Sequence, residues 1–390
     1  MIHYAAKIVE AIAVAGVTSA IGYYALCLWS ATSFARGRRG LPINRPDGFA
    51  PPVSILKPLK GGDVELYDAL RSHCRQDYPE YEIIFGVSDA DDPAIALVGR
   101  LRKEFPQSTI QCMVCDKKLG ANTKVSNLAQ MLPAASYDYL IVNDSDICVP
   151  GDYLQRVISP LSDAKLGMVT CLYRGIAART LGSRLESLGI STDFSAGVLV
   201  ARYLEHGLHF ALGSTLAFRR RDLQAIGGFE SFVDYLADDY ELARRIVERG
   251  FEVHLSELVV DTFLQPYSVR QFVDHQLRWL RGVRDCRPGG YAGLIFTFGI
   301  PWALLALAVS SAALWGWELL GATVALRLTV ALAMGAIVLR DPQVFRLLWL
   351  IPLRDVTALL LWIASFAGRT VSWRGDIFYL KDGKLARISP

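Results

Sequence analysis

Two pairs of aspartates, far apart in the sequence, have the spacing for metal binding and proton transfer. Asp144 and Asp146 are separated by one serine and follow a short apolar run, whereas Asp238 and Asp239 open an amphipathic stretch. Carboxylate oxygens bind Mg²⁺ and Mn²⁺, and a positioned aspartate can accept a proton from a hydroxyl group. Acids at such places also serve simply as helix caps, so each pair alone leaves that structural alternative open.

Other charged side chains follow further short apolar runs. Lys57 begins the loop Lys57-Pro58-Leu59-Lys60-Gly61, and Asp89 and Asp92 lie in the loop after the next run. Such side chains can hydrogen-bond to sugar hydroxyls or to a base. The sequence has neither a Walker loop nor a G-x-G-x-x-G turn, which argues against P-loop and dinucleotide chemistry.

Strand and helix patterns alternate along the stretch that carries these residues. Helical spacing of apolar residues fills the gaps between short β-rich runs, which predicts an α/β fold with a mostly parallel sheet. The predicted strands are Val53–Leu56, Glu82–Val87, Thr109–Val114 and Tyr139–Val142. Because ligands of such sheets bind beyond the carboxyl ends of the strands, we expect the charged loops to meet there.

Three arginines at three-residue spacing, Arg278, Arg281 and Arg284, precede an apolar region. Arginines on one helix face can neutralise a diphosphate. They can equally bind lipid headgroups at a membrane surface. The spacing alone leaves both functions open.

The composition indicates membrane segments, because 52% of the 390 residues are hydrophobic and only 20% are charged. The apolar run from Ile8 to Leu28 predicts a spanning helix. Two further apolar runs, Tyr291 to Trp315 and Leu319 to Leu339, predict a hairpin of two spanning helices. Val344 to Phe366 is interrupted by Pro352 and by two charges, which favours a re-entrant or interfacial segment. A kinked full span with its arginine paired internally is the alternative.

Charge and cysteine content restrict partners and compartment. A formal charge of +3, from 41 basic and 38 acidic residues, argues against a nucleic-acid partner. Seven scattered cysteines suggest no disulfide framework, which suits a reducing compartment. Arginines after the first apolar run and a basic tail after the last favour a cytosolic location for the α/β domain.

Several motifs, in their order along nearly the whole chain, resemble ceramide glucosyltransferase and its bacterial relatives. The motifs are Lys57 to Gly61, Asp89 to Ala94, Gly120 to Lys124 with Asn127-Leu128, Asp144 to Asp146, Gly227 to Phe229, Asp238 to Tyr240, Arg278-Trp279 and Val371 to Gly375. The resemblance implies an inverting glycosyltransferase with a Rossmann-like GT-A domain. Its bacterial branch, which the sequence resembles more, includes an enzyme that places N-acetylglucosamine on bacteriohopanetetrol.

The resemblance also implies roles for individual residues. Lys57, Asp89, Asp92 and Lys124 would lie around the uridine nucleotide, Asp144 and Asp146 would hold Mg²⁺ or Mn²⁺ against the diphosphate, Asp239 would be the base, and Arg278 and Trp279 would close over the leaving group and acceptor. One position departs from the family pattern, because His275 stands where Gln or Arg is usual. That substitution puts in doubt which side chain makes the first contact of this motif.

These inferences define an expected layout and function. We expect an anchor at 1–35, a GT-A domain at 50–267, an interfacial helix at 268–290, membrane segments at 291–367 and a cytosolic tail at 368–390. The expected reaction moves one N-acetylglucosamine, or glucose, from a UDP-sugar to bacteriohopanetetrol, or ceramide, in a bacterial inner membrane. A processive polysaccharide synthase and a nonenzymatic nucleotide-sugar sensor are the alternatives.

Overall fold

The computed structural model describes residues 2–40, 48–61, 64–373 and 376–387. Arg374 and Gly375, which belong to the last motif of the resemblance, lie outside them. The chain divides into two compact units. We call them the helical unit, from Met1–Gly40, Ala177–Tyr203 and Gln265–Asp382, and the sheet unit, from Leu41–Ile176, Leu204–Leu264 and Gly383–Pro390.

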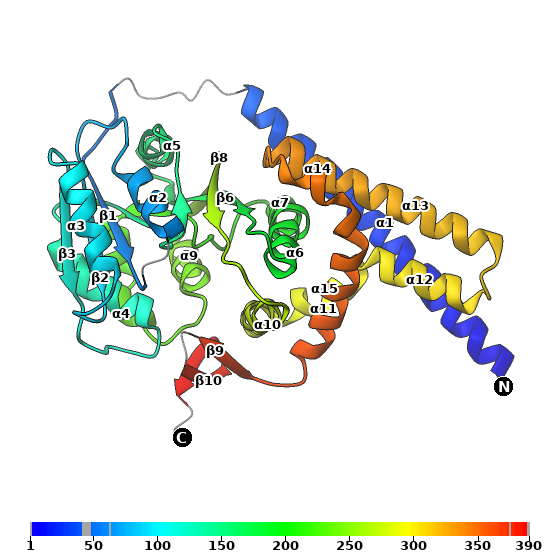
Figure 1. The fold of residues 1–390 in the computed structure, drawn as a ribbon. Coiled ribbons are helices and arrows are strands. Elements are labelled where there is room, and N and C mark those ends of the chain that lie inside the picture. Colours follow the sequence, from blue (N-terminus) through cyan, green and yellow to red (C-terminus); the bar gives the residue numbers. More distant parts are fainter. Residues whose placement is uncertain (1, 41–47, 62–63, 374–375, 388–390) are drawn as a thin grey trace. The chain divides into compact units, whose positions relative to one another are not determined.

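The sheet unit is built on one mixed sheet (Figure 1). Within the described residues its strands follow the order β3 (Thr109–Val114), β2 (Tyr81–Val87), β1 (Val53–Pro58), β4 (Tyr139–Val142), β7 (Leu216–Arg219), β6 (Leu166–Ile176), β8 (Glu252–Phe263) and β5 (Ile147–Cys148). Strand β1 pairs in parallel with β2 and β4, so that Val53 lies opposite Tyr81 and Tyr139. Strand β7 runs antiparallel to both of its neighbours. The α/β fold expected from the sequence is therefore confirmed.

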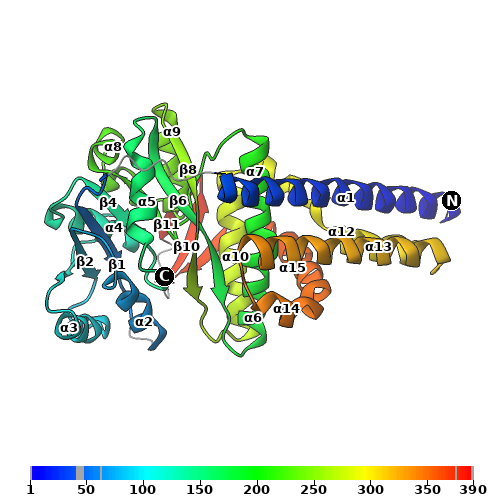
Figure 2. The same ribbon diagram turned by 90° about the horizontal axis from the view of Figure 1, so that it is seen from above.

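Helices cover the sheet and bury its strands (Figure 2). They are α2 (Val64–His73), α3 (Ala94–Glu104), α4 (Thr123–Met131), α5 (Tyr153–Ile158), α8 (Arg220–Ala225) and α9 (Asp238–Glu248). Every residue of β1 is buried, and Ile55 and Phe85 are fully inaccessible to solvent. A strand that is buried on both faces needs an almost continuous apolar run, which is the pattern seen in the sequence.

The last described segment of the chain also belongs to the sheet unit. Strand β11 (Lys384–Arg387) follows Gly383, whose carbonyl accepts a hydrogen bond from Leu236 N at 2.9 Å. Leu385 N donates to the carbonyl of Asp234 at 2.7 Å. The segment that precedes Asp238 is thus held by residues from the far end of the sequence.

The helical unit contains the long apolar helices. Its elements are α1 (Ile2–Gly40), α6 (Leu181–Gly189), α7 (Ser195–Leu204), α10 (Val269–Cys286), α11 (Pro288–Gly293), α12 (Gly299–Val309), α13 (Leu314–Ala331), α14 (Gln343–Leu347), α15 (Ile351–Ser365), β9 (Thr370–Trp373) and β10 (Asp376–Lys381). Helices α1, α12 and α13 run side by side in both views (Figures 1 and 2). Gly16 permits close packing, because a Cβ there would lie 2.4 Å from the ring of Trp302.

Three helices among the described residues are long and apolar enough to cross a membrane. They are Tyr4–Gly37, Leu314–Val338 and Gln343–Ser365. A fourth candidate is the pair Pro288–Thr297 and Gly299–Val309, which is bent by 51°. The predicted segments Ile8 to Leu28, Leu319 to Leu339 and Val344 to Phe366 therefore fall on helices of suitable length and composition, whereas Tyr291 to Trp315 covers the bent pair and the start of α13.

The third apolar region is helical through its proline. Pro352 lies in the first turn of α15, where its missing N–H removes no helical hydrogen bond. Arg354 and Asp355 are buried and face charged partners, as the internally paired alternative expects. Whether this helix crosses the bilayer or re-enters it stays a prediction.

Candidate active site

Asp144 follows the end of β4 in a loop whose backbone is fixed by its neighbour. The buried Asn143 donates through Nδ2 to the carbonyl of Ser214 at 2.6 Å and to the hydroxyl of Tyr153 at 2.9 Å. Asp144 N in turn donates to the carbonyl of Gly213 at 3.2 Å. These bonds hold the Asp144 carboxylate at the carboxyl end of the sheet, as the strand pattern predicts.

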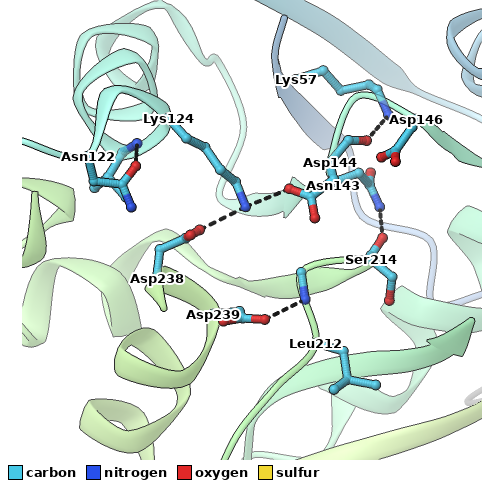
Figure 3. Close-up of polar contacts among 12 residues, drawn as sticks. Lys57, Asn122, Lys124, Asn143, Asp144, Asp146, Leu212, Ser214, Asp238 and Asp239 are labelled. Carbon is cyan, nitrogen blue, oxygen red and sulfur yellow. Dashed lines mark hydrogen bonds and ion pairs between the residues drawn. The ribbon is translucent and has the colours of Figure 1, made fainter. Parts of the chain in front are cut away.

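Lys124 connects Asp144 with the start of α9 (Figure 3). Its Nζ lies 2.7 Å from Asp144 Oδ1 and 2.8 Å from Asp238 Oδ2. Burial by itself lowers the pKa of Lys124, but the two carboxylates outweigh it and raise this pKa overall. The ammonium is therefore permanently charged at neutral pH, and it joins two sequence motifs that lie more than ninety positions apart, at 144 and 238.

The turn that carries Lys124 is itself tied to the segment before α9. Asn122 caps α4 by accepting a hydrogen bond from Val125 N, and its Nδ2 donates to the carbonyl of Tyr235 at 2.7 Å. Ala121 N donates to Asp234 Oδ1 at 2.8 Å.

The glycine turn before α9 adopts the left-handed backbone that the sequence suggests, with φ of +93° at Gly227.

Asp239 is anchored by two main-chain donors. Its Oδ2 accepts from Gly213 N at 2.9 Å, and its Oδ1 accepts from Tyr240 N at 2.8 Å. Burial and the adjacent Asp238 raise the pKa of Asp239 to about 6, against an opposing effect of Lys124. A carboxylate with this pKa is ionised at neutral pH and is a stronger base than an exposed aspartate.

Gly213 lies between Asp144 and Asp239. A Cβ at this position would come within 2.8 Å of Asp144 Oδ2 and 3.5 Å of Asp239 Oδ2. The glycine therefore lets both carboxylates approach the same main-chain segment. Sequence reasoning missed this residue, because a glycine outside a recognised motif gives no chemical signal.

Lys57 is fully buried at the end of β1, beside the second metal-ligand candidate, Asp146. Its Nζ donates to the carbonyl of Asp144 at 3.0 Å. Burial lowers the pKa of Lys57 to about 7, while Asp146 and Asp144 oppose that shift. Burial and Asp144 raise the pKa of Asp146, whose Oδ2 accepts from Thr262 Oγ1 at 2.9 Å.

His73, which the sequence analysis also missed, is the second side chain at the Lys57 ammonium. His73 Nδ1 lies 3.0 Å from the carbonyl of Ala69, and a carbonyl can only accept, so this nitrogen carries the proton. Its Nε2 is then the acceptor for Lys57 Nζ at 3.4 Å. Burial and the charge of Lys57 lower the pKa of His73, which keeps the ring neutral.

Asp89 and Asp92 make local contacts at the exit of β2. Asp92 Oδ1 accepts from Gly61 N at 3.0 Å and from Ala94 N at 2.9 Å, which links the first two loops and caps α3. The exposed Asp89 accepts from Asp91 N at 3.0 Å. These local hydrogen bonds would explain both aspartates by a structural role alone. The roles of Asp89 and Asp92 at a nucleotide stay predictions.

Arg278 and Trp279 lie on α10 in the helical unit. The ring centroid of Trp279 is 5.0 Å from that of His275 and 6.2 Å from that of Phe194. His275 Nδ1 is 3.1 Å from the buried Glu186, and its ring stacks on Tyr267. His275 therefore supports Trp279.

The other two arginines of α10 bind main-chain carbonyls. Arg281 Nη1 donates to the carbonyl of Thr370 at 2.5 Å. Arg284 donates to the carbonyls of Ser365 and Gly368, the latter at 2.8 Å. They thus hold the segment after α15, a use that the spacing of the arginines did not indicate.

Comparison with known proteins places the chain in a family. Residues 12–386 match the model of glycosyl transferase family 21. The chain belongs to this family. Ceramide glucosyltransferase 3 of Caenorhabditis elegans is 24% identical to this glycosyltransferase over 360 residues, which cover 87% of the chain and 75% of the relative. Ceramide glucosyltransferase of Komagataella phaffii is 35% identical over 114 residues, which cover 28% of the chain and 22% of the relative.

A solved structure shares the fold. A mannosyltransferase from Pyrobaculum calidifontis, solved in complex with GDP-Man and Mn²⁺, aligns with a TM-score of 0.54 and 18% identity. The alignment covers 91% of this glycosyltransferase and 99% of the mannosyltransferase. The GT-A fold and the ceramide glucosyltransferase-like family expected from the sequence are confirmed.

In one group of charged side chains in the sheet unit, carboxylates outnumber lysines. We use the name acidic cluster for Asp144, Asp146, Asp238 and Asp239 together with Lys57 and Lys124. Four carboxylates face two ammonium groups, which explains why burial and mutual repulsion raise the pKa of Asp146 and Asp239. Among the described residues, no three His, Cys, Asp or Glu side chains are grouped to hold a metal ion. The arrangement would gain stability from a further positive charge.

Proposed function

We propose that this family 21 glycosyltransferase transfers one sugar from a UDP-sugar to a hydroxyl group of a membrane lipid, with inversion at the anomeric carbon. N-acetylglucosamine is the favoured sugar and bacteriohopanetetrol the favoured acceptor, with glucose and ceramide as alternatives. The observation that carries the proposal is the approach of Asp144 and Asp239 to Gly213, with Lys124 bound to Asp144.

The donor set fits a divalent cation that is shared with the substrate. Asp144 and Asp146 provide carboxylate oxygens, and the excess of negative charge around them favours a cation. Mg²⁺ commonly binds through one or two carboxylates and completes its shell with substrate phosphates and water. We therefore assign Mg²⁺ or Mn²⁺ to Asp144 and Asp146, and the mannosyltransferase of the same fold was solved with Mn²⁺. When bound, the ion neutralises charge on the departing diphosphate.

Asp239 is the base of the proposed reaction. A carboxylate oxygen of Asp239 accepts the proton of the lipid hydroxyl as the hydroxyl oxygen bonds to the anomeric carbon. The bond from that carbon to the diphosphate breaks on the opposite face, and UDP leaves with the bonding electrons. Two hydrogen bonds from main-chain N–H groups orient the Asp239 carboxylate. The raised pKa of Asp239 makes it easier for this carboxylate to take up the proton. A positioned base of this kind typically contributes about 10²–10⁴-fold to the rate.

The lysines act on the donor. Lys124 is a buried, charged ammonium group of the acidic cluster, and it complements phosphate oxygens without needing to be ordered on binding. Lys57, which is fully buried and has its pKa lowered to about 7, is proposed to lie beside the nucleotide. Asp89 and Asp92 are proposed to contact the uridine. Arg278 and Trp279 are proposed to close over the diphosphate and the acceptor, with His275 supporting Trp279.

The membrane supplies the acceptor in this proposal. The chain has helices long and apolar enough to span a bilayer, and the names of its relatives specify a lipid acceptor. A lipid substrate does not have to leave the bilayer when its enzyme is membrane-bound. The protein is proposed to lie in a bacterial inner membrane, and the arginines at the end of α1 together with the free thiols favour a cytosolic sheet unit.

A transfer assay tests the function directly. The purified protein is incubated with Mn²⁺, radiolabelled UDP-N-acetylglucosamine or UDP-glucose, and bacteriohopanetetrol or ceramide in mixed micelles. We expect one sugar on one lipid, with inverted configuration in the NMR spectrum of the product. A ladder of products would indicate a processive synthase, and the absence of any labelled lipid would contradict the proposal.

Asp239→Asn tests the assignment of the base. We expect transfer to fall at least 10²-fold while the affinity for UDP, measured by calorimetry, changes less than twofold. Glu248→Gln is the matched control, because Glu248 lies on the same helix with its side chain 56% exposed. Loss of UDP binding in Asp239→Asn would assign the residue to metal binding or structure instead.

A further inference from the structure

A second group of buried charges lies within the helical unit. Arg327 of α13 donates through Nε and Nη2 to the carboxylate of Asp355, at 2.9 and 3.0 Å. Arg327 also pairs with Asp193, and its Nη2 donates to Thr192 Oγ1 at 3.1 Å. Only 2% of Arg327 and 5% of Asp355 is exposed. Both residues lie on helices apolar enough to cross a membrane.

Arg354 joins the group through a space left by a glycine. A Cβ on Gly189 would come within 2.5 Å of Arg354 Nη2, so the guanidinium lies directly against this backbone. Arg354 Nη2 is 3.6 Å from Asp193 Oδ2. Gly189 precedes the π-helical turn Ile190–Phe194, which contains Asp193. We call Arg327, Arg354, Asp193 and Asp355 the arginine cluster.

Four polar atoms of this cluster are buried and have no hydrogen-bond partner within the part of the chain that the structure describes. They are Arg327 Nη1, Arg354 Nε, Arg354 Nη1 and Asp193 Oδ2. Such atoms in an apolar environment cost free energy, because little water is present to satisfy them. The unmatched set contains three donor atoms and one acceptor. A ligand that fits it needs mainly accepting oxygens and at least one hydrogen to donate.

The charges of the cluster argue against an anionic ligand. Two guanidinium groups face two carboxylates, and Ser191, from the same π-helical turn as Asp193, donates to another buried carboxylate, that of Asp341, at 2.8 Å. Positive charge is therefore not in excess, so a phosphate would find no net attraction. Hydroxyl oxygens, which both accept and donate, match the unmatched atoms.

We propose that Arg327, Arg354 and Asp193 bind the uncharged, hydroxylated headgroup of the acceptor lipid, an inference that rests on the proposed function. Asp193 is the most exposed member of the arginine cluster, with 34% of its side chain accessible, so a headgroup enters beside it. The next residue, Phe194, packs against Trp279. The headgroup site therefore adjoins the side chain that is proposed to close over the acceptor.

The test separates acceptor binding from donor binding. The wild-type protein, Arg354→Met and Gly189→Ala are assayed with whichever of bacteriohopanetetrol and ceramide the wild type glycosylates. We expect the acceptor KM to rise at least tenfold in both variants, while the donor KM and the UDP affinity change less than twofold. Arg346→Met is the matched control, because Arg346 is an exposed arginine of the same unit.

Thermal unfolding gives a second readout that does not require transfer. We expect the acceptor lipid alone to raise the Tm of the wild type and of Arg346→Met, and to leave that of Gly189→Ala unchanged. An unchanged acceptor KM in a variant with intact UDP affinity would overturn the proposal. Equal stabilisation of the wild type by phosphatidylglycerol would also overturn it, because the site would then accept an anion. Absence of transfer by the wild type to either lipid would contradict the proposed function itself.

Discussion

The acidic cluster of the sheet unit and the arginine cluster of the helical unit are both buried groups of charges, but their balance differs. In the acidic cluster four carboxylates face two lysines, and the pKa of two of the aspartates is raised in consequence. In the arginine cluster each guanidinium has a carboxylate partner. The first is therefore suited to receive a cation, and the second to receive a neutral group that completes its hydrogen bonds.

The same difference predicts opposite effects on stability. An unbalanced cluster stores repulsion that binding can relieve, so it reduces the stability of the protein without its ligand. A balanced buried pair is costly to break, because removal of one partner leaves an uncompensated charge in an apolar environment. Variants that neutralise one carboxylate in each cluster distinguish these two cases.

The largest predicted effect on stability is that of Asp355→Asn. Loss of the carboxylate removes the charged partner that accepts two hydrogen bonds from Arg327, and we expect a loss of about 3–5 kcal/mol in the free energy of unfolding. Asp146→Asn should cost little or be stabilising, because it removes a carboxylate that Asp144 repels. Denaturant unfolding in detergent measures the free energy of unfolding of both variants. Glu318→Gln is the control, because Glu318 is exposed. Equal losses in the two variants would remove the distinction between the clusters.

Gly213→Ala should have the next largest effect, on activity. The new Cβ would lie 2.8 Å from Asp144 Oδ2, so the Asp144 carboxylate or the backbone that binds Asp239 has to move. Small displacements of catalytic groups can cost about 10²-fold in rate, and we expect a fall of that size in kcat. Gly207→Ala is the control, because among the described residues no atom beyond its chain neighbours lies within 4 Å of its Cβ position. Wild-type kcat in Gly213→Ala would mean that Asp144 and Asp239 need not share this segment.

The pH dependence of kcat/KM should reflect the excess of negative charge in the acidic cluster. Asp239 acts as a base only when it is ionised, so we expect activity to fall about tenfold per pH unit below about 6, the pKa of this residue. Asp238→Asn removes a negative charge that raises this pKa, so the acidic limb should move to lower pH. A limb that stays at the same pH in Asp238→Asn would assign it to another group.

The smallest predicted effect is that of His73→Leu. Removing the acceptor for Lys57 leaves a buried ammonium with one partner fewer, and a hydrogen bond of this kind is worth about 0.5–1.5 kcal/mol. We expect the donor KM to rise roughly three- to tenfold with little change in kcat. His73→Gln, whose side-chain carbonyl can accept, should restore part of the affinity. If His73→Gln and His73→Leu are equally impaired, the ring has a packing role.

The sequence predicted the parts of the site that depend on strand order. Carboxyl ends of parallel strands meet at one edge, so the loops of Lys57 and Asp144 could be placed together from the strand pattern. Lys124 was placed there only by the family resemblance. The meeting of Asp144 with Asp239 was expected from the family resemblance rather than from spacing. For Asp89, Asp92, Arg278 and Trp279 the structure supplies positions, and their functional roles stay predictions.

Other features could not be predicted because they depend on contacts between distant segments. Gly213 matters only because two carboxylates approach it, and His73 matters only because Lys57 is buried beside it. Arg281 and Arg284 have the spacing of a phosphate-binding face, yet they bind carbonyls of residues some eighty positions away. A pattern of residue types cannot distinguish phosphate binding from carbonyl binding, because both kinds of oxygen accept hydrogen bonds from the same guanidinium N–H groups.

The return of β11 to the sheet unit restricts how the chain is threaded through the bilayer. Leu264 and Gly383 belong to the same compact unit, although the apolar helices α12, α13 and α15 lie between them in the sequence. A folded unit lies on one side of a lipid bilayer, so the proposed membrane location predicts an even number of crossings between these two residues. With α13 as one of two crossings, this prediction puts the turn at Ser311 and the loop at Arg340 on opposite sides of the membrane.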